Sequence, residues 1–212
     1  MSSSAVLTGD LIGSTEVEPE AVDLAMAALS CAAATIADWA AEDTRFTRFR
    51  GDGWQICLAD PALVLRASLL LLASLRAKGG GLATRLSVAV GTVERLGNSG
   101  LAEASGTAFT VSGRNLDKMA SLSTFVYAAP DRDHHWQTAV MDLAAWQTQQ
   151  WTREQAEAAM LALDLPRLTD QALAAHLGIS RQAFQSRLKG TGLAAMTSAL
   201  LAFELDRTTM EP

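Results

Sequence analysis

A chain of 212 residues can bury a substantial core, and its composition, 49% hydrophobic and 19% charged, excludes a disordered protein. The net charge of −6 excludes a global positive field, so any contact with nucleic acid has to come from a local patch. Cys31 and Cys57 lie in apolar patterns and no signal peptide is recognisable, so we expect buried, reduced thiols in a cytoplasmic protein. The most apolar window, residues 62–77, is too short to span a bilayer, and no membrane segment is predicted.

Strand and helix patterns alternate over the first 130 residues. Residues 4–15 form an apolar run, predicted as a buried strand, that ends in a loop of small residues. Gly51-Asp52-Gly53 lies between two alternating runs and predicts a hairpin, because glycine accepts positive φ without a Cβ clash. The other predicted elements are a helix at 20–42, a helix from Pro61 to about 77, a strand at 86–93, a helix at 106–120 and a strand at 124–128. The order β-α-β-β-α-β, then α-β, indicates an α+β fold of the ferredoxin-like βαββαβ type.

Two aspartates occupy equivalent settings in this pattern. Asp10 lies at the end of the first strand and Asp52 at the hairpin tip, and in a ferredoxin-like sheet these two strands are neighbours. Ser14 and Thr15 add hydroxyl groups to a loop that precedes a helix, where phosphate can bind. Paired carboxylates beside such a loop predict a divalent cation, Mg²⁺ or Mn²⁺, holding a nucleotide triphosphate. The alternative is a structural turn, in which aspartate is common.

Three motifs in this region resemble those of class III nucleotide cyclases. They are the segments 8–15, 50–53 and 105–114. A bacterial family of cyclase-like proteins, the SatD family, is more similar still. Its members combine a Gly-Asp loop, a Gly-Asp hairpin and a helix of pattern G-x-A-F-x-x-S-G-R-x-L-D, which is present here at 106–117. The resemblance spans residues 4–128 and implies a cyclase-like domain.

The resemblance also implies roles for individual residues. Asp10 and Asp52 match the two metal ligands, and Arg114 matches a catalytic arginine that stabilises charge on the phosphates. Three nucleotide-contacting positions depart from the family pattern: Arg48 stands for the base-selecting lysine, Glu103 for the base-contacting aspartate and Thr110 for the ribose-orienting asparagine. These departures argue against cyclase activity on ATP. For Arg114 the alternative is a surface arginine that pairs with Glu103 or Asp117.

The character of the sequence changes after Pro130, and residues 130–150 are predicted to connect two domains. Trp136, Val140, Leu143 and Trp146 follow a helical spacing, and we expect this segment to pack or dimerise through its tryptophans. The apolar helix around residues 69–75 is the other candidate dimer interface.

The last 60 residues predict an all-α helix-turn-helix domain. Thr152 begins a capping box, and Pro166 is expected to break the helix that follows. Apolar residues then lock two short helices across a turn at Gly178, and a supporting helix is predicted at 193–203. The pattern resembles the DNA readers of sigma factors and LuxR-like regulators. The face predicted to bind DNA consists of Ser180, Arg181, Gln182, Gln185, Ser186 and Lys189.

A helical hairpin for protein contact is the alternative to DNA binding. Six basic and seven acidic residues from Thr152 onward favour that alternative, but the basic residues gather on the predicted recognition helix. The preferred interpretation is a cytoplasmic regulator, not an enzyme, that binds double-stranded DNA as a homodimer. Its domains are predicted at 1–129, 130–150 and 151–212, and the first would dimerise or sense a nucleotide. The alternatives are an active nucleotide cyclase, which the departures above oppose, and a pure dimerisation scaffold, which the retained Asp10, Asp52 and Arg114 oppose.

Overall fold

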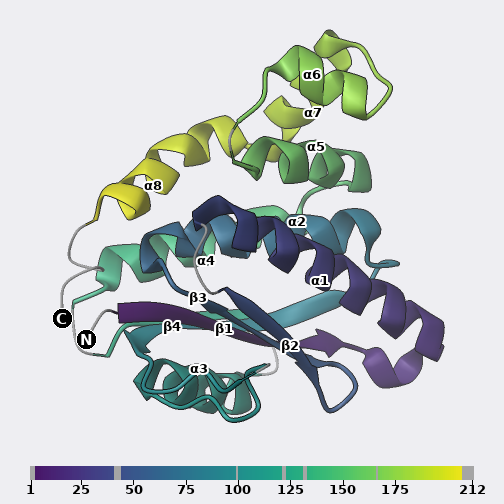
Figure 1. The fold of residues 1–212 in the computed structure, drawn as a ribbon. Helices are drawn as coiled ribbons and strands as arrows, with labels where there is room; N and C mark the ends of the chain where they lie inside the picture. The colour runs from purple at the N-terminus through teal and green to yellow at the C-terminus, as the bar shows by residue number, and fades with distance from the viewer. Residues whose placement is uncertain are drawn as a thin grey trace.

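The computed structural model describes residues 3–40, 44–98, 100–120, 123–130, 133–165 and 167–206. Over these ranges the protein is an α+β structure with one five-stranded mixed sheet and eight α-helices (Figure 1). The end of the predicted helix at 20–42 and the predicted break at Pro166 lie outside the described residues.

The sheet has the strand order β2-β3-β1-β4-β5. Its strands are β1 (Ser3–Ile12), β2 (Arg45–Phe49), β3 (Gly53–Leu58), β4 (Ala83–Thr92) and β5 (Phe125–Ala128). Neighbouring strands are antiparallel except for β4 and β5, which are parallel. Because β1 is central, its carboxyl end lies beside both the hairpin tip and the start of β4.

Helices cover both faces of the sheet (Figure 1). α1 (Pro19–Ala40) and α2 (Val64–Lys78), which follows a 3-10 turn at Pro61–Leu63, lie on one face, and α3 (Thr107–Asp117) lies on the other. Successive side chains of a strand point to opposite faces. Leu7 of β1 accordingly joins the large core under α1 and α2, whereas Val6 joins a small cluster beside α3.

The hairpin between β2 and β3 forms as predicted, but its backbone differs from the prediction. Positive φ occurs at Arg50 (51°) and Gly51 (85°), whereas Gly53 already belongs to β3. Gly53 is needed for close packing instead, since a Cβ there would lie 2.7 Å from the Phe49 ring and 2.9 Å from the Phe49 carbonyl oxygen. The two residues before Asp52, Arg50 and Gly51, therefore make the turn in left-handed conformations and position Asp52 at its end.

Among the described residues, α1 is the one helix long and apolar enough to cross a membrane, judged by length and composition alone. Its mean hydropathy over Pro19–Trp39 is 1.5. A core helix passes the same test, and Leu29 and Ile36 of α1 are fully buried in the main core. Cys57 is buried as predicted, but Cys31 on α1 is exposed, so that part of the prediction is wrong.

The C-terminal helices share their core with the sheet. They are α4 (His135–Gln149), α5 (Arg153–Leu163), α6 (Asp170–His176), α7 (Arg181–Thr191) and α8 (Leu193–Leu205). One contiguous cluster of buried side chains runs from the sheet through α2 to Phe184 of α7 and Phe203 of α8. Trp151 is fully buried between α4 and α5, and its indole N–H donates to the Thr191 carbonyl oxygen (2.9 Å). The backbone carbonyl oxygen of Trp151 accepts from Arg76 Nε (2.8 Å). This tryptophan ties α2 to the end of α7.

The apolar stripe predicted on α4 points outward rather than inward. Leu143 is 68% exposed and Trp146 is 59% exposed, while Trp136 makes an edge-on contact with Phe203. The buried side of α4 consists instead of Gln137, Met141, Ala144, Ala145 and Thr148. Residues 69–75 of α2, the other predicted dimer interface, are mostly buried within the chain and cannot serve that role.

Candidate functional site

Asp10 meets Arg85 at the carboxyl end of β1. The two residues are partners in the β1–β4 register, and their side chains are 26% and 34% exposed. Arg85 Nε donates to Asp10 Oδ1 (2.8 Å), and Arg85 Nη2 donates to Asp10 Oδ2. This two-point ion pair fixes the orientation of the Asp10 carboxylate.

Asp52 lies beside this pair, as the sequence predicts. Asp10 is the register partner of Gly53, and the Asp52 carbonyl oxygen accepts from the Leu11 N–H (3.2 Å). Ser14 Oγ donates to Asp52 Oδ2 at 2.5 Å. The predicted phosphate loop therefore commits one of its two hydroxyl groups to Asp52, and the other, on Thr15, is exposed.

Arg85 pairs with Asp10 and lies within electrostatic range of two further carboxylates, Asp52 and Asp117. The hydrogen bonds that Arg85 donates to Asp10 raise the pKa of Arg85 most; burial opposes this, and the charges of Asp10, Asp117 and Asp52 add to it. Asp117 is the last residue of α3, so the helix end adds an acidic group that the metal-site prediction did not include. We call Asp10, Asp52, Arg85 and Asp117 the Arg85 cluster.

A row of polar side chains places α3 over this end of the sheet. Thr47, Gln55 and Thr8 are register partners across β2, β3 and β1. Gln55 Nε2 donates to Thr8 Oγ1 (2.9 Å), which lies 2.9 Å from Ser112 Oγ of α3. This bridge between sheet and helix fixes the position of α3, whose last residue, Asp117, follows Ser112 by about one and a half turns.

Sequence reasoning missed Arg85 because it began the strand at the first apolar residue, Leu86. The structure begins β4 at Ala83. The signal was present in the alternation, since Arg85 continues the polar face of Ser87 whereas Leu86 continues the apolar face of Val88. The order of strands in the sheet then brings that polar face to Asp10.

The Arg85 cluster accommodates a divalent cation only in competition with Arg85. The described residues contain no group of three or more His, Cys, Asp or Glu side chains arranged to hold a metal ion. Both Asp10 oxygens already accept from Arg85. Three carboxylates and one guanidinium leave the cluster negative, so it attracts cations and repels a bare triphosphate. Nucleotide binding at this site would therefore need a metal ion that shares the Asp10 oxygens with Arg85 or displaces it.

The structure does not bring Arg48 into the cluster. Arg48 Nη1 pairs with Asp23 of α1 (2.7 Å), and its Nε donates to the Gly51 carbonyl oxygen (2.6 Å). It thus projects toward the α1 face of the sheet, whereas Asp10 and Thr8 lie on the α3 face. Its contacts brace the hairpin against α1.

The other residues expected to contact a nucleotide lie around α3. Glu103 is exposed in the loop before α3, where its carbonyl oxygen accepts from Arg95 Nε (3.0 Å). Thr110 and Arg114 are exposed and lie four residues apart, so they share one outward face of the helix. Among the described residues Arg114 has no ion-pair partner, and neither pairing of the surface alternative is present. Among the described residues, the side chains of Glu103, Thr110 and Arg114 therefore make no hydrogen bond or ion pair with the Arg85 cluster of the same chain.

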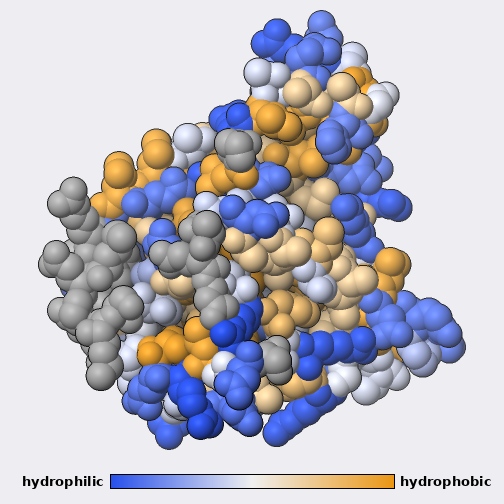
Figure 2. All heavy atoms as spheres, in the orientation of Figure 1, coloured by the Kyte–Doolittle hydropathy of each residue, from blue (hydrophilic) through white to orange (hydrophobic). Residues whose placement is uncertain are grey.

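The six residues predicted to bind DNA form the outer side of α7 and its cap. The cap residue Ser180 accepts from the Ala183 N–H (3.2 Å), and Phe184 anchors the helix in the core. The turn before α7 has Gly178 at φ 65°, as its position predicts, and Ile179 N–H donates to the Ala174 carbonyl oxygen (3.1 Å). All six predicted side chains are exposed. Hydrophilic side chains cover the tip of the molecule where α6 and α7 lie (Figure 2).

The charges near this face are partly neutralised. Arg187 pairs with Glu157 (3.4 Å), and Gln185 Nε2 donates to Asp170 Oδ2 (2.9 Å). Arg181 and Lys189 have no ion-pair partner among the described residues, which leaves them free to meet phosphate. Lys189 also lines a cavity of about 660 Å³ beside α8.

Comparison with known proteins adds no assignment: no family model matches the chain, and no curated protein matches it.

Proposed function

We propose that this protein is a cytoplasmic DNA-binding regulator in which α6 and α7 form a helix-turn-helix and α7 is the recognition helix. The observation that carries the proposal is the division of α7 into two sides. Phe184 is fully buried, while the side chains of residues 181, 182, 185, 186 and 189 are exposed. A short, capped helix that presents donors and acceptors on one side is suited to base edges and phosphates in a major groove.

The sheet domain is proposed to be a ferredoxin-like, cyclase-like unit of the SatD type. Its support is that β1 lies between β3 and β4 with antiparallel neighbours and β2 outside β3, the arrangement expected of a βαββαβ unit. The proposed ligand is a nucleotide with Mg²⁺ or Mn²⁺ at Asp10 and Asp52. The Asp10–Arg85 pair favours a second role, a scaffold, because each side chain already satisfies the other. Catalysis has the least support, since Arg114 and Thr110 do not contact the carboxylates.

The exposed face of α4 is the proposed dimer interface. Val140, Leu143 and Trp146 line an apolar cavity of about 310 Å³ whose other side is formed by α8 through Ala195, Met196 and Ala199. In a twofold dimer, the exposed indole of Trp146 in each copy could insert into the apolar cavity of the other copy. Dimerisation would present two α7 helices to half-sites about one helical turn apart.

Selection of bound sequences from a random duplex library with the full-length protein tests the proposal. We expect one enriched sequence with twofold symmetry. Enrichment of nothing, or unchanged enrichment with Arg181→Ala, contradicts α7 as the recognition helix.

A further inference from the structure

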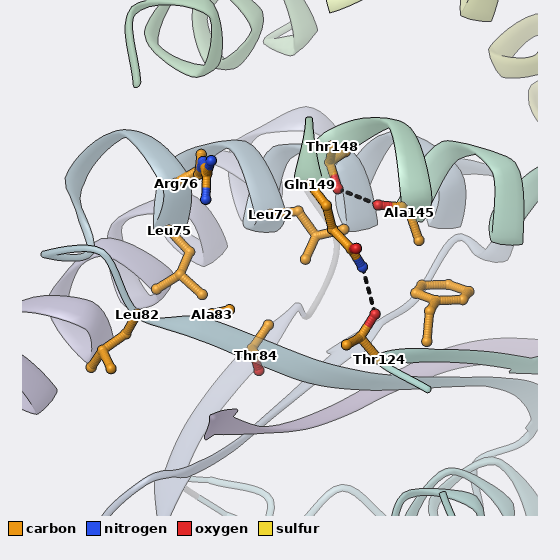
Figure 3. A pocket seen from close by; sticks show the side chains of 11 residues that line it. Leu72, Leu75, Arg76, Leu82, Ala83, Thr84, Thr124, Ala145, Thr148 and Gln149 are labelled. Carbon is orange, nitrogen blue, oxygen red and sulfur yellow. Dashed lines mark hydrogen bonds between the residues drawn. The ribbon is translucent and has the colours of Figure 1, made fainter. Parts of the chain in front are cut away.

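A second concave site lies away from the Arg85 cluster, between α2, α4 and the edge of the sheet. It is a cavity of about 280 Å³ (Figure 3). Leucines and an aromatic ring form much of its wall, and its polar side chains come from α2, α4 and the sheet side. Its lining includes Leu72, Leu75, Phe125, Arg76, Thr124 and Gln149.

The apolar wall is suited to a compact hydrocarbon body. Leu75 and Phe125 are buried, and Leu72 is half-buried. A dry cavity of about 150 Å³ is enough to bind benzene. The present cavity is almost twice that size, so it has room for an aromatic ring with a short chain.

Arg76 supplies a cation at the side of this cavity. Its Nε donates to the Trp151 carbonyl oxygen (2.8 Å), and the side chain has no ion-pair partner among the described residues. Arg66, which also belongs to α2, is by contrast paired with Glu204 (2.7 Å). The two terminal nitrogens of Arg76 are therefore available for a carboxylate, whose planar geometry they match.

A hydroxyl group on the sheet side adds a second polar place to the cavity wall. Thr124 Oγ1 accepts from Gln149 Nε2 at 2.7 Å, and its own hydrogen remains available to donate. Figure 3 shows Thr124 and Gln149 facing each other across one side of the cavity. Among the described residues, Arg76 is the one charged side chain that lines this cavity, so the site suits a single negative charge and not the several charges of a triphosphate.

We propose that this cavity binds a small organic monoanion, with its apolar body between Leu72, Leu75 and Phe125 and its carboxylate on the terminal nitrogens of Arg76. The site is distinct from the proposed nucleotide site and does not depend on DNA binding. It has one structural consequence for the C-terminal helices. Because Arg76 holds Trp151 through Nε, and Trp151 donates to Thr191 at the end of α7, the anion binds a side chain that also links α2 to α7.

The test is calorimetric titration of the full-length protein, without DNA, with 3-phenylpropanoate and with the neutral 3-phenylpropan-1-ol. We expect one equivalent of the anion to bind, and Arg76→Gln to weaken it roughly tenfold or more, as expected for loss of a charge-assisted hydrogen bond. The alcohol should bind more weakly and be insensitive to Arg76→Gln. Lys78→Gln is the matched control, because it removes an exposed cation from the same last turn of α2 without touching this cavity.

A second variant tests the cavity itself. Ala83 lines the opening and is exposed, so Ala83→Leu narrows the site with little risk to folding, and it should weaken both probes. Failure of the anion to bind, equal binding to the parent and to Arg76→Gln, or an equal loss with Lys78→Gln overturns the proposal. Because no DNA is present, these results are independent of whether α7 reads DNA.

Discussion

The Arg85 guanidinium donates to both oxygens of the Asp10 carboxylate across the β1–β4 pair. The pair is the centre of a cluster in which Asp52 and Asp117 add two more negative charges. Loss of the guanidinium would leave three carboxylates at one end of the sheet without a counter-charge. The arrangement makes Arg85 a structural requirement of the site as long as no metal ion is bound.

Replacing Arg85 with glutamine should lower the free energy of unfolding by about 1 kcal/mol, the range of a partly exposed cross-strand ion pair. The measurement is urea denaturation in a double-mutant cycle with Asp10→Asn. Since the two groups interact directly, we expect the double variant to be more stable than the two separate losses predict. Strictly additive losses would show that the pair contributes nothing.

The effect of Arg85→Gln should also be independent of pH between about pH 6 and pH 9. The pKa of Arg85 is raised in the folded protein, mainly by its hydrogen bond to Asp10. A group with a raised folded pKa contributes its full stability below the unfolded pKa, and loses it only as pH rises through the folded value. For arginine both values lie far above pH 9. A destabilisation that shrinks between pH 6 and pH 9 would contradict this assignment.

Local patterns were enough to predict most elements of the sheet, but not the partners that complete the site. The first strand, the hairpin, the helix after Pro61 and the capping box at Thr152 depend on nearby residues, and the structure has all of them. The start of β4 depends on pairing with β1, a contact between distant segments, so Arg85 was missed. On α4 the apolar stripe was expected to pack or to dimerise through its tryptophans, and helical spacing alone does not distinguish the two. Small residues such as Ala144 and Ala145 are buried instead, because they let α4 approach its neighbours closely.

Residues 151–212 should not fold when expressed alone. Ala156, Ala159 and Leu163 of α5 are fully buried in the core shared with α2, and a separate fragment would expose this face to water. The measurement is the amide spectrum by NMR and the thermal transition by circular dichroism, compared with those of the full chain. Dispersed amide signals and a cooperative transition in the fragment would establish an independent C-terminal domain.

The two unpaired cations of α7 should contribute differently to DNA binding. Arg181→Ala should remove about 1–3 kcal/mol of discrimination at one base pair. Lys189→Ala should weaken all sequences similarly and reduce the salt dependence by about one unit. Lys78→Ala, at the end of α2, is the control for loss of one positive charge. Filter binding at several salt concentrations separates the two effects, and equal behaviour of all three variants would refute the proposed roles.

Leu143→Ser should convert a dimer to a monomer. The side chain is 68% exposed on the apolar face of α4, so the substitution removes contact area between copies without disturbing the core. Leu24→Ser on α1 is the matched control, because Leu24 is also an exposed leucine of a helix and lies outside the proposed interface. Sedimentation velocity measures the result. A parent protein that is monomeric with and without DNA, or a dimer indifferent to Leu143→Ser, contradicts this interface.

The last prediction concerns Asp52, because it separates a sensor from a scaffold and from a cyclase. Asp52→Asn removes a charged oxygen ligand but keeps an oxygen that can accept from Ser14, so the hairpin should stay folded. A sensor should bind a nucleoside triphosphate only with Mn²⁺ or Mg²⁺, and lose that binding in Asp52→Asn. Binding without metal would contradict the negative character of the Arg85 cluster.

Titration of a panel of nucleoside triphosphates with Mn²⁺, followed by an assay for pyrophosphate, distinguishes the three roles. A sensor binds nucleotide, changes its DNA affinity and releases no pyrophosphate. A scaffold binds none, and its Asp10→Ala, Asp52→Ala double variant still binds DNA like the parent. A cyclase releases pyrophosphate, and either Asp52→Asn or Arg114→Ala stops it. We expect the first or second result, because Arg114 makes no contact with the carboxylates and Arg85 already occupies both oxygens of Asp10. Pyrophosphate release that disappears in Asp52→Asn would reverse this order, and would require Arg85 to leave Asp10 when the nucleotide binds.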